Sequence, residues 1–260
     1  MCEVGRADSH GSAGSLMIAP LWTILIPTIG RRADQFRALV LELLAQAEPR
    51  HGEVTVLAYY NNGEHSLGHI RQSLVEHARS IYVSFVDDDD RVPDYYVQQV
   101  RTAIHEYAAD HFEPLSPDFE PTVPGVTHQT HLPDQVGWRM QHYSDGVPSK
   151  PTYHSIKYRD WWDDERGYYR DVSHLNPIRR ELALACGDFR RGDPPEDVAW
   201  SDQMRGHIKT EALVPDEYAM YHYHSSGDST WRPGSVQPTG SERRVEIEHP
   251  LFVYHPDSSD

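Results

Sequence analysis

Short apolar runs alternate with segments of helical periodicity in the first part of the chain. The runs cover residues 22–27, 54–60 and 83–86, and their β-branched and aromatic side chains predict buried strands. Between and after these runs, apolar residues recur every three or four positions, which predicts helices that bury one face. Strands that alternate with helices of this length predict right-handed crossovers and a parallel sheet. The pattern therefore predicts an α/β fold whose first three strands end at the same edge.

Polar residues follow each of these three predicted strands. Thr28 follows the first, Asn61 follows the second, and the four aspartates Asp87–Asp90 follow the third. Ligands of open parallel sheets bind outside the carboxyl ends of the strands, so we expect these side chains to converge on one site. Four carboxylates there could gather a divalent cation and, through it, a phosphate. A solvated acidic turn explains the same aspartates when they are considered alone.

The pattern changes after a third helix, which is predicted to run from residue 93 to about 110. Residues 111–151 are rich in Pro, Asp and His and predict a loop-rich insertion, with one alternating piece at 136–140 that could form a strand. Aromatic residues are then frequent between 153 and 169. Such clustering indicates either a stacking surface for sugars or bases, or a small second core under a long loop.

Two helices and a strand are predicted in the last third of the chain. Asn176 is a suitable N-cap for a helix that Gly187 can close. Glu196 and Asp197 begin the next helix, where the helix dipole favours carboxylates. The final strand, at 218–224, alternates so that its two histidines share a face.

We expect one domain over residues 18–232, with a nucleotide-binding half at about 20–110 and an acceptor half at about 135–232. Residues 1–17 are expected to be a disordered leader, and residues 233–260 a C-terminal extension. No run approaches the roughly 18 apolar residues that span a membrane, and the N-terminus lacks the pattern of a secretory signal. These features predict a soluble, cytoplasmic protein without a membrane partner.

Charge and cysteine content exclude two further classes of site. The formal net charge of −16 argues against a broad surface for nucleic-acid phosphates, which requires clustered Lys and Arg. Cys2 and Cys186 are the only cysteines, which is typical of a reducing compartment and leaves no cysteine-based zinc site.

Several motifs, in this order and spacing, resemble those of family 2 glycosyltransferases. They are an Ile-Pro-Thr strand end at 26–28, a D-x-D motif at 87–89 continued by Asp-Asp-Arg, the pair Glu196-Asp197, and a late histidine followed by serine. The resemblance covers residues 20–231 and implies a single GT-A-type, Rossmann-like domain. That fold has a mostly parallel central sheet flanked by helices and a small antiparallel portion. Residues 68–72, 154–161 and 174–177 resemble a branch often encoded by bacteriophages.

The resemblance implies a donor site in the first half of the chain. The residues expected to contact the nucleotide are Pro27, Thr28, Arg31, Asn61, Arg71, Asp87 and Asp88. Asp87 and Asp89, together with His224, would hold Mn²⁺ or Mg²⁺. Asn61 stands where many relatives have an aspartate that contacts the base, so it keeps an acceptor atom but lacks the charge.

The resemblance also implies the chemistry. Asp197 would be the catalytic base, with Glu196 as its partner, and the donor would be a nucleoside-diphosphate sugar, most simply a UDP-sugar. The base takes the proton of an acceptor hydroxyl that attacks opposite the diphosphate, which inverts the anomeric carbon. Candidate residues on the acceptor side are His174, Asn176, Trp161 and Trp200. The acceptor itself stays open among a modified DNA base, a virion protein and a glycan.

Two other functions explain parts of the same pattern. A metal-dependent hydrolase or nucleotidyltransferase could use the aspartates with His222 and His224, and it would consume a donor without any acceptor. A non-catalytic carbohydrate-binding protein could retain the same fold.

Overall fold

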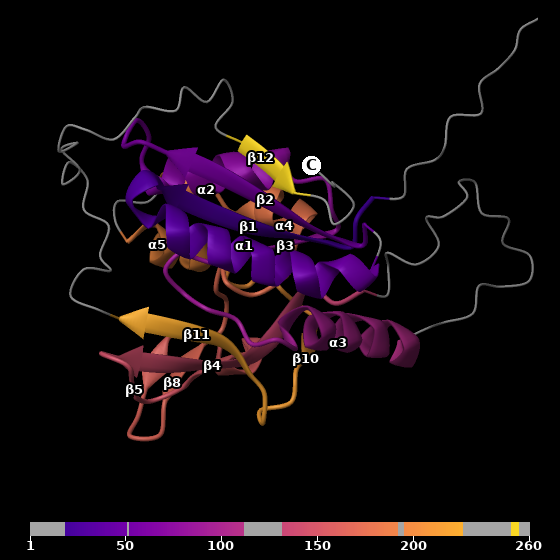
Figure 1. Ribbon diagram of the computed structural model, residues 1–260. Coiled ribbons are helices and arrows are strands. Elements are labelled where there is room, and N and C mark those ends of the chain that lie inside the picture. The colour runs from indigo at the N-terminus through magenta and orange to yellow at the C-terminus, as the bar shows by residue number, and fades with distance from the viewer. Residues whose placement is uncertain (1–18, 51, 112–131, 192–194, 226–250, 255–260) are drawn as a thin grey trace, which may run out of the picture.

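A computed structural model describes five parts of the chain, which are residues 19–50, 52–111, 132–191, 195–225 and 251–254. The expected leader at 1–17 lies outside the described residues. So do residues 112–131 of the expected insertion and most of the expected extension at 233–260. The described residues form one mixed sheet with helices packed against it (Figure 1).

The first half has the predicted β-α-β-α-β order followed by a third helix. Its elements are β1 (Trp22–Ile29), α1 (Ala33–Ala47), β2 (Val54–Asn61), α2 (Leu67–His77), β3 (Tyr82–Phe85) and α3 (Tyr96–Asp110). β1 lies between β2 and β3 and runs parallel to both. Its residues 22–28 are all buried because helices and neighbouring segments cover both faces of the sheet, which explains the continuous apolar run in the sequence.

The amphipathic helices pack as their periodicity predicts. α1 buries Leu39, Val40, Leu43 and Ala47. Ser66 is the N-cap of α2, and its hydroxyl accepts a hydrogen bond from the backbone N–H of His69 (3.2 Å). Short 3₁₀ turns lie at Gly30–Arg32, Glu48–Arg50, Ile156–Tyr158 and Phe189–Arg191. The turn at Gly30–Arg32 is the connection that leads the chain from the end of β1 into α1.

The second half is built around one long strand, β4 (Gln135–Ser144). Its partners are short: β5 (Val147–Pro148), β6 (Thr152–His154), β9 (Ile178–Arg179), β10 (Glu211–Leu213) and β11 (Ala219–Ser225), while β7 (Trp162–Asp163) and β8 (Tyr168–Arg170) extend the sheet from β6. The strand predicted at 136–140 is therefore confirmed and is longer than expected. Residues 135–144 and 147–148 belong to the sheet, so this part of the expected insertion is not irregular.

The two halves share the sheet through β9, which pairs antiparallel with both β3 and β4. Two helices follow β9, α4 (Arg180–Cys186) and α5 (Glu196–Met204). The prediction that Asn176 caps a helix is wrong, because residues 178–179 form β9 and the helix begins only at Arg180. Asn176 is instead fully buried: its amide donates to the Val136 carbonyl (2.9 Å), and its oxygen pairs with His154 Nδ1 (2.7 Å). Gly187 ends α4 as predicted.

A last strand, β12 (Leu251–Tyr254), lies within the expected C-terminal extension. It pairs antiparallel with β2, which places it at the edge of the sheet in the order β12-β2-β1-β3-β9-β4-β6-β8-β7 (Figure 1). One cluster of buried apolar side chains runs through both halves. The predicted α/β class, with a mostly parallel central sheet and a small antiparallel portion, is confirmed. In the described parts of the chain, no helix has the length and apolar character to cross a membrane.

Candidate active site

A cavity of about 510 Å³ lies at the carboxyl ends of β1, β2 and β3. This volume is within the range of pockets that bind small organic ligands. The cavity is lined by Pro27, Thr28, Ile29, Arg32, Asn61, Leu67, Ile70, Arg71, Asp87, Asp88, Asp89, Pro195, Glu196 and Asp197. The predicted convergence is confirmed for Thr28, Asn61 and Asp87–Asp89, whereas Asp90 does not line the cavity. The start of α5 completes the cavity from the second half of the chain.

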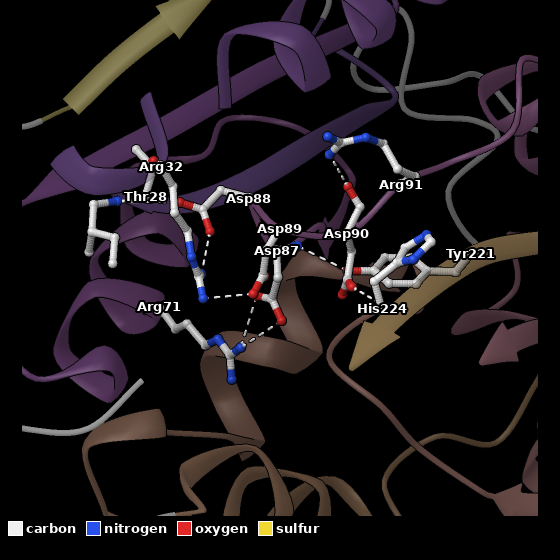
Figure 2. Close-up of polar contacts among 11 residues, drawn as sticks. Thr28, Arg32, Arg71, Asp87, Asp88, Asp89, Asp90, Arg91, Tyr221 and His224 are labelled. Carbon is white, nitrogen blue, oxygen red and sulfur yellow. Dashed lines mark hydrogen bonds and ion pairs between the residues drawn. The ribbon is translucent and has the colours of Figure 1, made fainter. Parts of the chain in front are cut away.

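Asp88 attaches the acidic turn to the end of β1. The Thr28 hydroxyl donates to Asp88 Oδ2 (2.8 Å), and Arg32 Nη1 donates to Asp88 Oδ1 (2.7 Å) (Figure 2). Arg32 Nη2 also pairs with Asp89 Oδ2 (2.6 Å). Burial raises the pKa of Asp88, and the charge of Arg32 opposes that shift. Arg32 thus holds two of the four aspartates beside the first 3₁₀ turn.

Arg71 connects the acidic turn with α5. It is buried in α2, and its Nη2 lies 3.1 Å from Asp87 Oδ1 while its Nη1 lies 2.6 Å from Glu196 Oε1. A buried guanidinium needs such partners because desolvation of its charge is costly. Burial raises the pKa of Glu196, and the charge of Arg71 acts against that shift. Arg71 therefore fixes the relative positions of the D-x-D motif and the Glu-Asp pair.

Asp90 points away from the cavity and binds the turn to β11. The Tyr221 hydroxyl donates to Asp90 Oδ2 (2.9 Å) and accepts from the backbone N–H of Asp87 (3.0 Å) (Figure 2). The backbone N–H of His224 donates to Asp90 Oδ1 (2.9 Å). Burial raises the pKa of Asp90 well above its usual value. This side chain has a supporting place in the structure and does not line the cavity.

The cavity has an excess of negative charge. Five carboxyl groups and two guanidinium groups line it, so five less two leaves a formal excess of three negative charges. Burial raises the pKa of Asp89 to about 6, because its two aspartate neighbours add to the desolvation that Arg32 partly offsets. The excess of negative charge would stabilise a bound cation. An anionic ligand would find positively charged partners in the cavity only in Arg32 and Arg71.

The predicted metal ligands do not assemble as a set of three. Tyr221 faces Asp90, so alternation along β11 turns the ring of His224 to the opposite face of the strand. There the ring stacks on Tyr143, with centroids 4.9 Å apart and planes at 9°. No group of three His, Cys, Asp or Glu side chains suited to a metal occurs among the described residues. Asp87 and Asp89 remain together in the cavity.

Asp197 and Glu196 both lie in the first turn of α5 and line the cavity. Asp197 Oδ1 accepts a hydrogen bond from the backbone N–H of Val198 (2.9 Å), and the Asp197 carbonyl accepts from the Ser201 hydroxyl (2.8 Å). These bonds hold Asp197 at the N-terminus of the helix. Glu196 is occupied by Arg71, whereas no arginine or lysine pairs with Asp197 among the described residues.

Two predicted nucleotide contacts are placed differently from expectation. Arg31 is exposed and does not line the cavity, and the neighbouring Arg32 lies there instead. Asn61 lines the cavity but uses its amide locally. It accepts from the backbone N–H groups of Glu64 (3.1 Å) and His65 (3.2 Å), and it donates to the His65 carbonyl (3.0 Å). Its side chain therefore shapes the loop that follows β2.

Three of the four residues expected on the acceptor side lie in the core. Asn176, Trp200 and His174 are at most 6% exposed. Trp200 stacks on Phe189 with ring centroids 4.8 Å apart. Burial lowers the pKa of His174 well below its usual value, so the ring is neutral. These three side chains are not available to an acceptor at the surface, whereas Trp161 is half-buried.

Three residues near the site do not feature in the sequence prediction. They are Arg32, Tyr221 and Tyr223. Tyr223 shares the face of Tyr221 and is 36% exposed. Burial, together with the charges of Asp90, Asp87, Asp89 and Asp197, raises its pKa. The alternation that places two histidines on one face of β11 also places these tyrosines on the other, so the sequence did contain a signal for them.

No family model and no curated protein sequence matches this chain. Solved structures of the glycosyltransferase TarS from S. aureus do match. For TarS 1-349 the TM-score is 0.50 at 12% identity, covering 78% of this chain and 60% of TarS 1-349. For TarS 1-349 in complex with UDP the TM-score is 0.51 at 13% identity, covering 79% and 61%. The chain has a glycosyltransferase-like fold. It spans about three fifths of the solved chains.

Proposed function

We propose that the protein transfers a sugar from a nucleoside-diphosphate donor to an acceptor hydroxyl. The observation that carries the proposal is that one cavity is lined by both the D-x-D carboxylates and the Glu196–Asp197 pair, although more than 100 positions separate them in the sequence. The glycosyltransferase-like fold supports it, and a TarS structure contains UDP. A UDP-sugar is therefore the donor that we expect.

Donor binding would use the arginines and the strand ends. Arg32 and Arg71 offer guanidinium donors to a diphosphate, which planar guanidinium groups bind well. Thr28 and Asn61 line the same cavity at the ends of β1 and β2, where the nucleoside would lie. Asp88 would hold Arg32 in position and would not need to contact the donor.

Asp87 and Asp89 would hold a divalent cation. Mg²⁺ is commonly bound by one or two carboxylates together with substrate phosphates, so two protein ligands are sufficient and His224 is not required. The excess of carboxylates in the cavity suits such an ion. When bound, Mg²⁺ or Mn²⁺ would neutralise charge on the departing diphosphate. Arg32, which now pairs with Asp89, would have to release that carboxylate.

Asp197 would act as the general base. Glu196 is paired with Arg71 and would orient the first turn of α5, whereas Asp197 is not neutralised by an ion pair with an arginine or lysine in the described residues. A carboxylate within hydrogen-bond reach of the acceptor hydroxyl can take its proton as the oxygen attacks the anomeric carbon. Attack opposite the diphosphate would invert that centre, as in family 2 enzymes.

Replacing Asp197 with Asn tests the proposal. A screen of nucleotide-sugars by thermal shift, with and without Mn²⁺, first identifies the donor, because a ligand that binds only the folded state raises the melting temperature. With that donor, we expect the Asp197→Asn variant to lose about 10²- to 10⁴-fold in kcat, while the dissociation constant for UDP is unchanged.

Asp202, an exposed carboxylate on the same helix, provides the matched control, and Asp202→Asn should turn over at the wild-type rate. Wild-type turnover by Asp197→Asn, or the absence of any nucleotide that binds, would contradict the proposal. Release of UDP at one rate with and without acceptor would favour the hydrolase alternative. Nucleotide binding without turnover by the wild-type protein would favour the non-catalytic one.

A further inference from the structure

Three aromatic rings lie side by side on the sheet of the second half. Tyr223 of β11, His142 of β4 and Tyr168 of β8 form a row in which the Tyr223–His142 centroids are 5.1 Å apart and the His142–Tyr168 centroids 5.3 Å. These strands belong to the layer that lies below β1, β2 and β3 in Figure 1. His142 is held in place by Thr152, whose hydroxyl lies 2.6 Å from its Nε2. The row is therefore a fixed surface on folded strands.

One end of this row lies beside the candidate active site. Tyr221, two residues before Tyr223 on the same strand face, makes hydrogen bonds to the Asp90 carboxylate and to the backbone of Asp87. Figure 2 shows Tyr221 directed toward the acidic turn. The charges of Asp89 and Asp197 also act on the Tyr223 hydroxyl. Tyr223 is 36% exposed, so its ring is available to a ligand beside the acidic turn.

The other end of the row is closed by a cation and a further aromatic ring. The Arg170 guanidinium lies 5.6 Å from the Tyr168 ring centroid and 4.7 Å from that of Trp161. Arg170 also donates to the carbonyls of Trp162 (3.1 Å) and Tyr169 (2.9 Å). Its charge is thus engaged by the aromatic rings and the backbone. We call Tyr223, His142, Tyr168 and Trp161 the aromatic row.

The charges around the aromatic row disfavour an anionic ligand. Lys150, over the Tyr168 ring at 5.4 Å, donates to the Asp164 carbonyl (2.7 Å) and lies 3.8 Å from the carboxylate of Asp163. The nearby aspartates and the net charge of −16 repel polyanions. Burial and the charge of Arg170 lower the pKa of His142, so its ring is uncharged at neutral pH. Lys150 and Arg170 each donate to backbone carbonyls, and the aromatic faces of the row match the apolar C–H faces of sugar rings.

We infer that the aromatic row binds a neutral oligosaccharide and presents one of its hydroxyl groups to Asp197. The inference rests on the proposed glycosyl transfer and narrows the acceptor to a glycan. Sugar rings would stack along Tyr223 and Tyr168, while the tyrosine hydroxyls offer hydrogen bonds to the ring substituents. The opposite face of the same strands would not take part.

Binding to immobilised glycans tests this inference with the full chain. The probes are maltohexaose, cellohexaose and chitohexaose as neutral glycans, with sulfated and phosphorylated glycans as anionic ones. We expect binding of at least one neutral glycan, weakened about tenfold or more by Tyr223→Ala and by Tyr168→Ala. The Tyr223→Phe and Tyr168→Phe variants, which keep the ring, should retain most of the affinity.

Trp162 provides the matched control. It is 44% exposed and stacks on Tyr169, which lies on the opposite face of β8 from Tyr168. Trp162→Ala should leave glycan binding unchanged. Loss of binding in Trp162→Ala, equal binding by the row variants and the wild type, binding of anionic glycans alone, or no glycan binding would each overturn the inference.

UDP affinity, measured by calorimetry in the same variants, separates this inference from the proposed function. Wild-type UDP binding in Tyr223→Ala and Tyr168→Ala shows that these variants are folded. If the protein binds UDP but no glycan, only the inference about the aromatic row is overturned. Row-dependent glycan binding by a protein that binds no nucleotide supports the row as a glycan site and overturns the proposed transfer.

Discussion

Tyr221 is the residue on which the acidic turn and the second half of the molecule both depend. Its hydroxyl is completely buried, accepts from the Asp87 backbone and donates to Asp90. A buried polar network of this kind fixes geometry only while each member keeps its partner. The positions of Asp87 and Asp89 in the cavity are therefore set partly by a tyrosine that does not line it.

Replacing Tyr221 with Phe should lower the free energy of unfolding by about 1–3 kcal/mol, because an Asp90 oxygen and a backbone N–H lose their buried partner. Urea unfolding measures the change. Tyr95 is the control: it is half-buried, and its hydroxyl makes only a long bond to the Ala219 carbonyl (3.5 Å). Equal effects of Tyr221→Phe and Tyr95→Phe would show that the network contributes nothing specific.

At the scale of single residues, the sequence indicates the groups that carry charge but not their partners. Asp87, Asp89 and Asp197 are placed at the cavity, as their positions after a strand and at a helix start imply. Arg32 could not be distinguished from Arg31, since one residue of register in a 3₁₀ turn decides which side chain faces inward. Asn176 has the composition of a cap, and only the distant Val136 and His154 show that it is a core residue.

Among the elements, the turn between β3 and α3 concentrates the most negative charge, because it carries four consecutive aspartates. Its aspartates are packed against β1 and β11, and Arg91 exchanges two backbone hydrogen bonds with His222 (2.8 and 3.2 Å). The turn is thus held on both sides, and its carboxylates cannot separate to relieve their repulsion. Burial in this packed turn raises the pKa values of Asp88, Asp89 and Asp90, and the charges of neighbouring aspartates add to the shift.

The raised pKa of Asp89 predicts a pH-dependent stability. A carboxyl group whose pKa rises from 3.8 unfolded to about 6 folded contributes its full stability below about pH 4 and loses it as the pH rises through 6. Without divalent cations, Asp89→Asn should exceed the wild type in stability by about 1–3 kcal/mol at pH 7.5, with the difference vanishing near pH 4.

Urea unfolding in EDTA at several pH values gives this difference. Asp94→Asn, which alters an exposed carboxylate a few residues along the chain, should differ little from the wild type at any pH. A difference between Asp89→Asn and the wild type that stays constant from pH 4 to 8 would mean that Asp89 titrates normally.

Elements with a local periodicity are recognisable in the sequence, whereas strands that depend on distant partners are not. The helices α1, α2 and α3 are recognisable in the sequence from apolar stripes that bury one face. β4 is not apparent as a ten-residue strand, because the strands that bury it, β9, β10 and β11, come from 40 to 80 positions later. No pattern within β4 itself encodes those partners.

The whole molecule is held together by a sheet that passes from one half to the other. β9 bridges β3 and β4, and β12 closes the opposite edge by pairing with β2. The parallel order of the first three strands followed from the sequence, since alternating strands and helices leave few topologies. The antiparallel pairing of β9 with β3 and of β12 with β2 could not be inferred, because nothing in a short strand specifies a partner more than 90 residues away.

Removal of residues 249–260 should destabilise the protein by about 2–4 kcal/mol, since the backbone hydrogen bonds between β12 and β2 are lost. The exposed edge of β2 should also promote self-association. Urea unfolding and light scattering measure these two effects. A shorter truncation that removes only residues 255–260 keeps β12 and should behave like the full chain. Identical behaviour of both truncations would show that β12 does not protect the sheet.

The ion pairs of Arg71 have a consequence for recombination between related genes. Arg71 lies 125 positions from Glu196, one in each half of the chain, and the guanidinium is buried between Asp87 and Glu196. A chimera that joins the first half of one such protein to the second half of a related one inherits the two positions from different parents. Unless both parents encode matching charges, the chimera buries an arginine that lacks one of its two carboxylate partners. The two halves can therefore be exchanged between genes only when this pair is preserved.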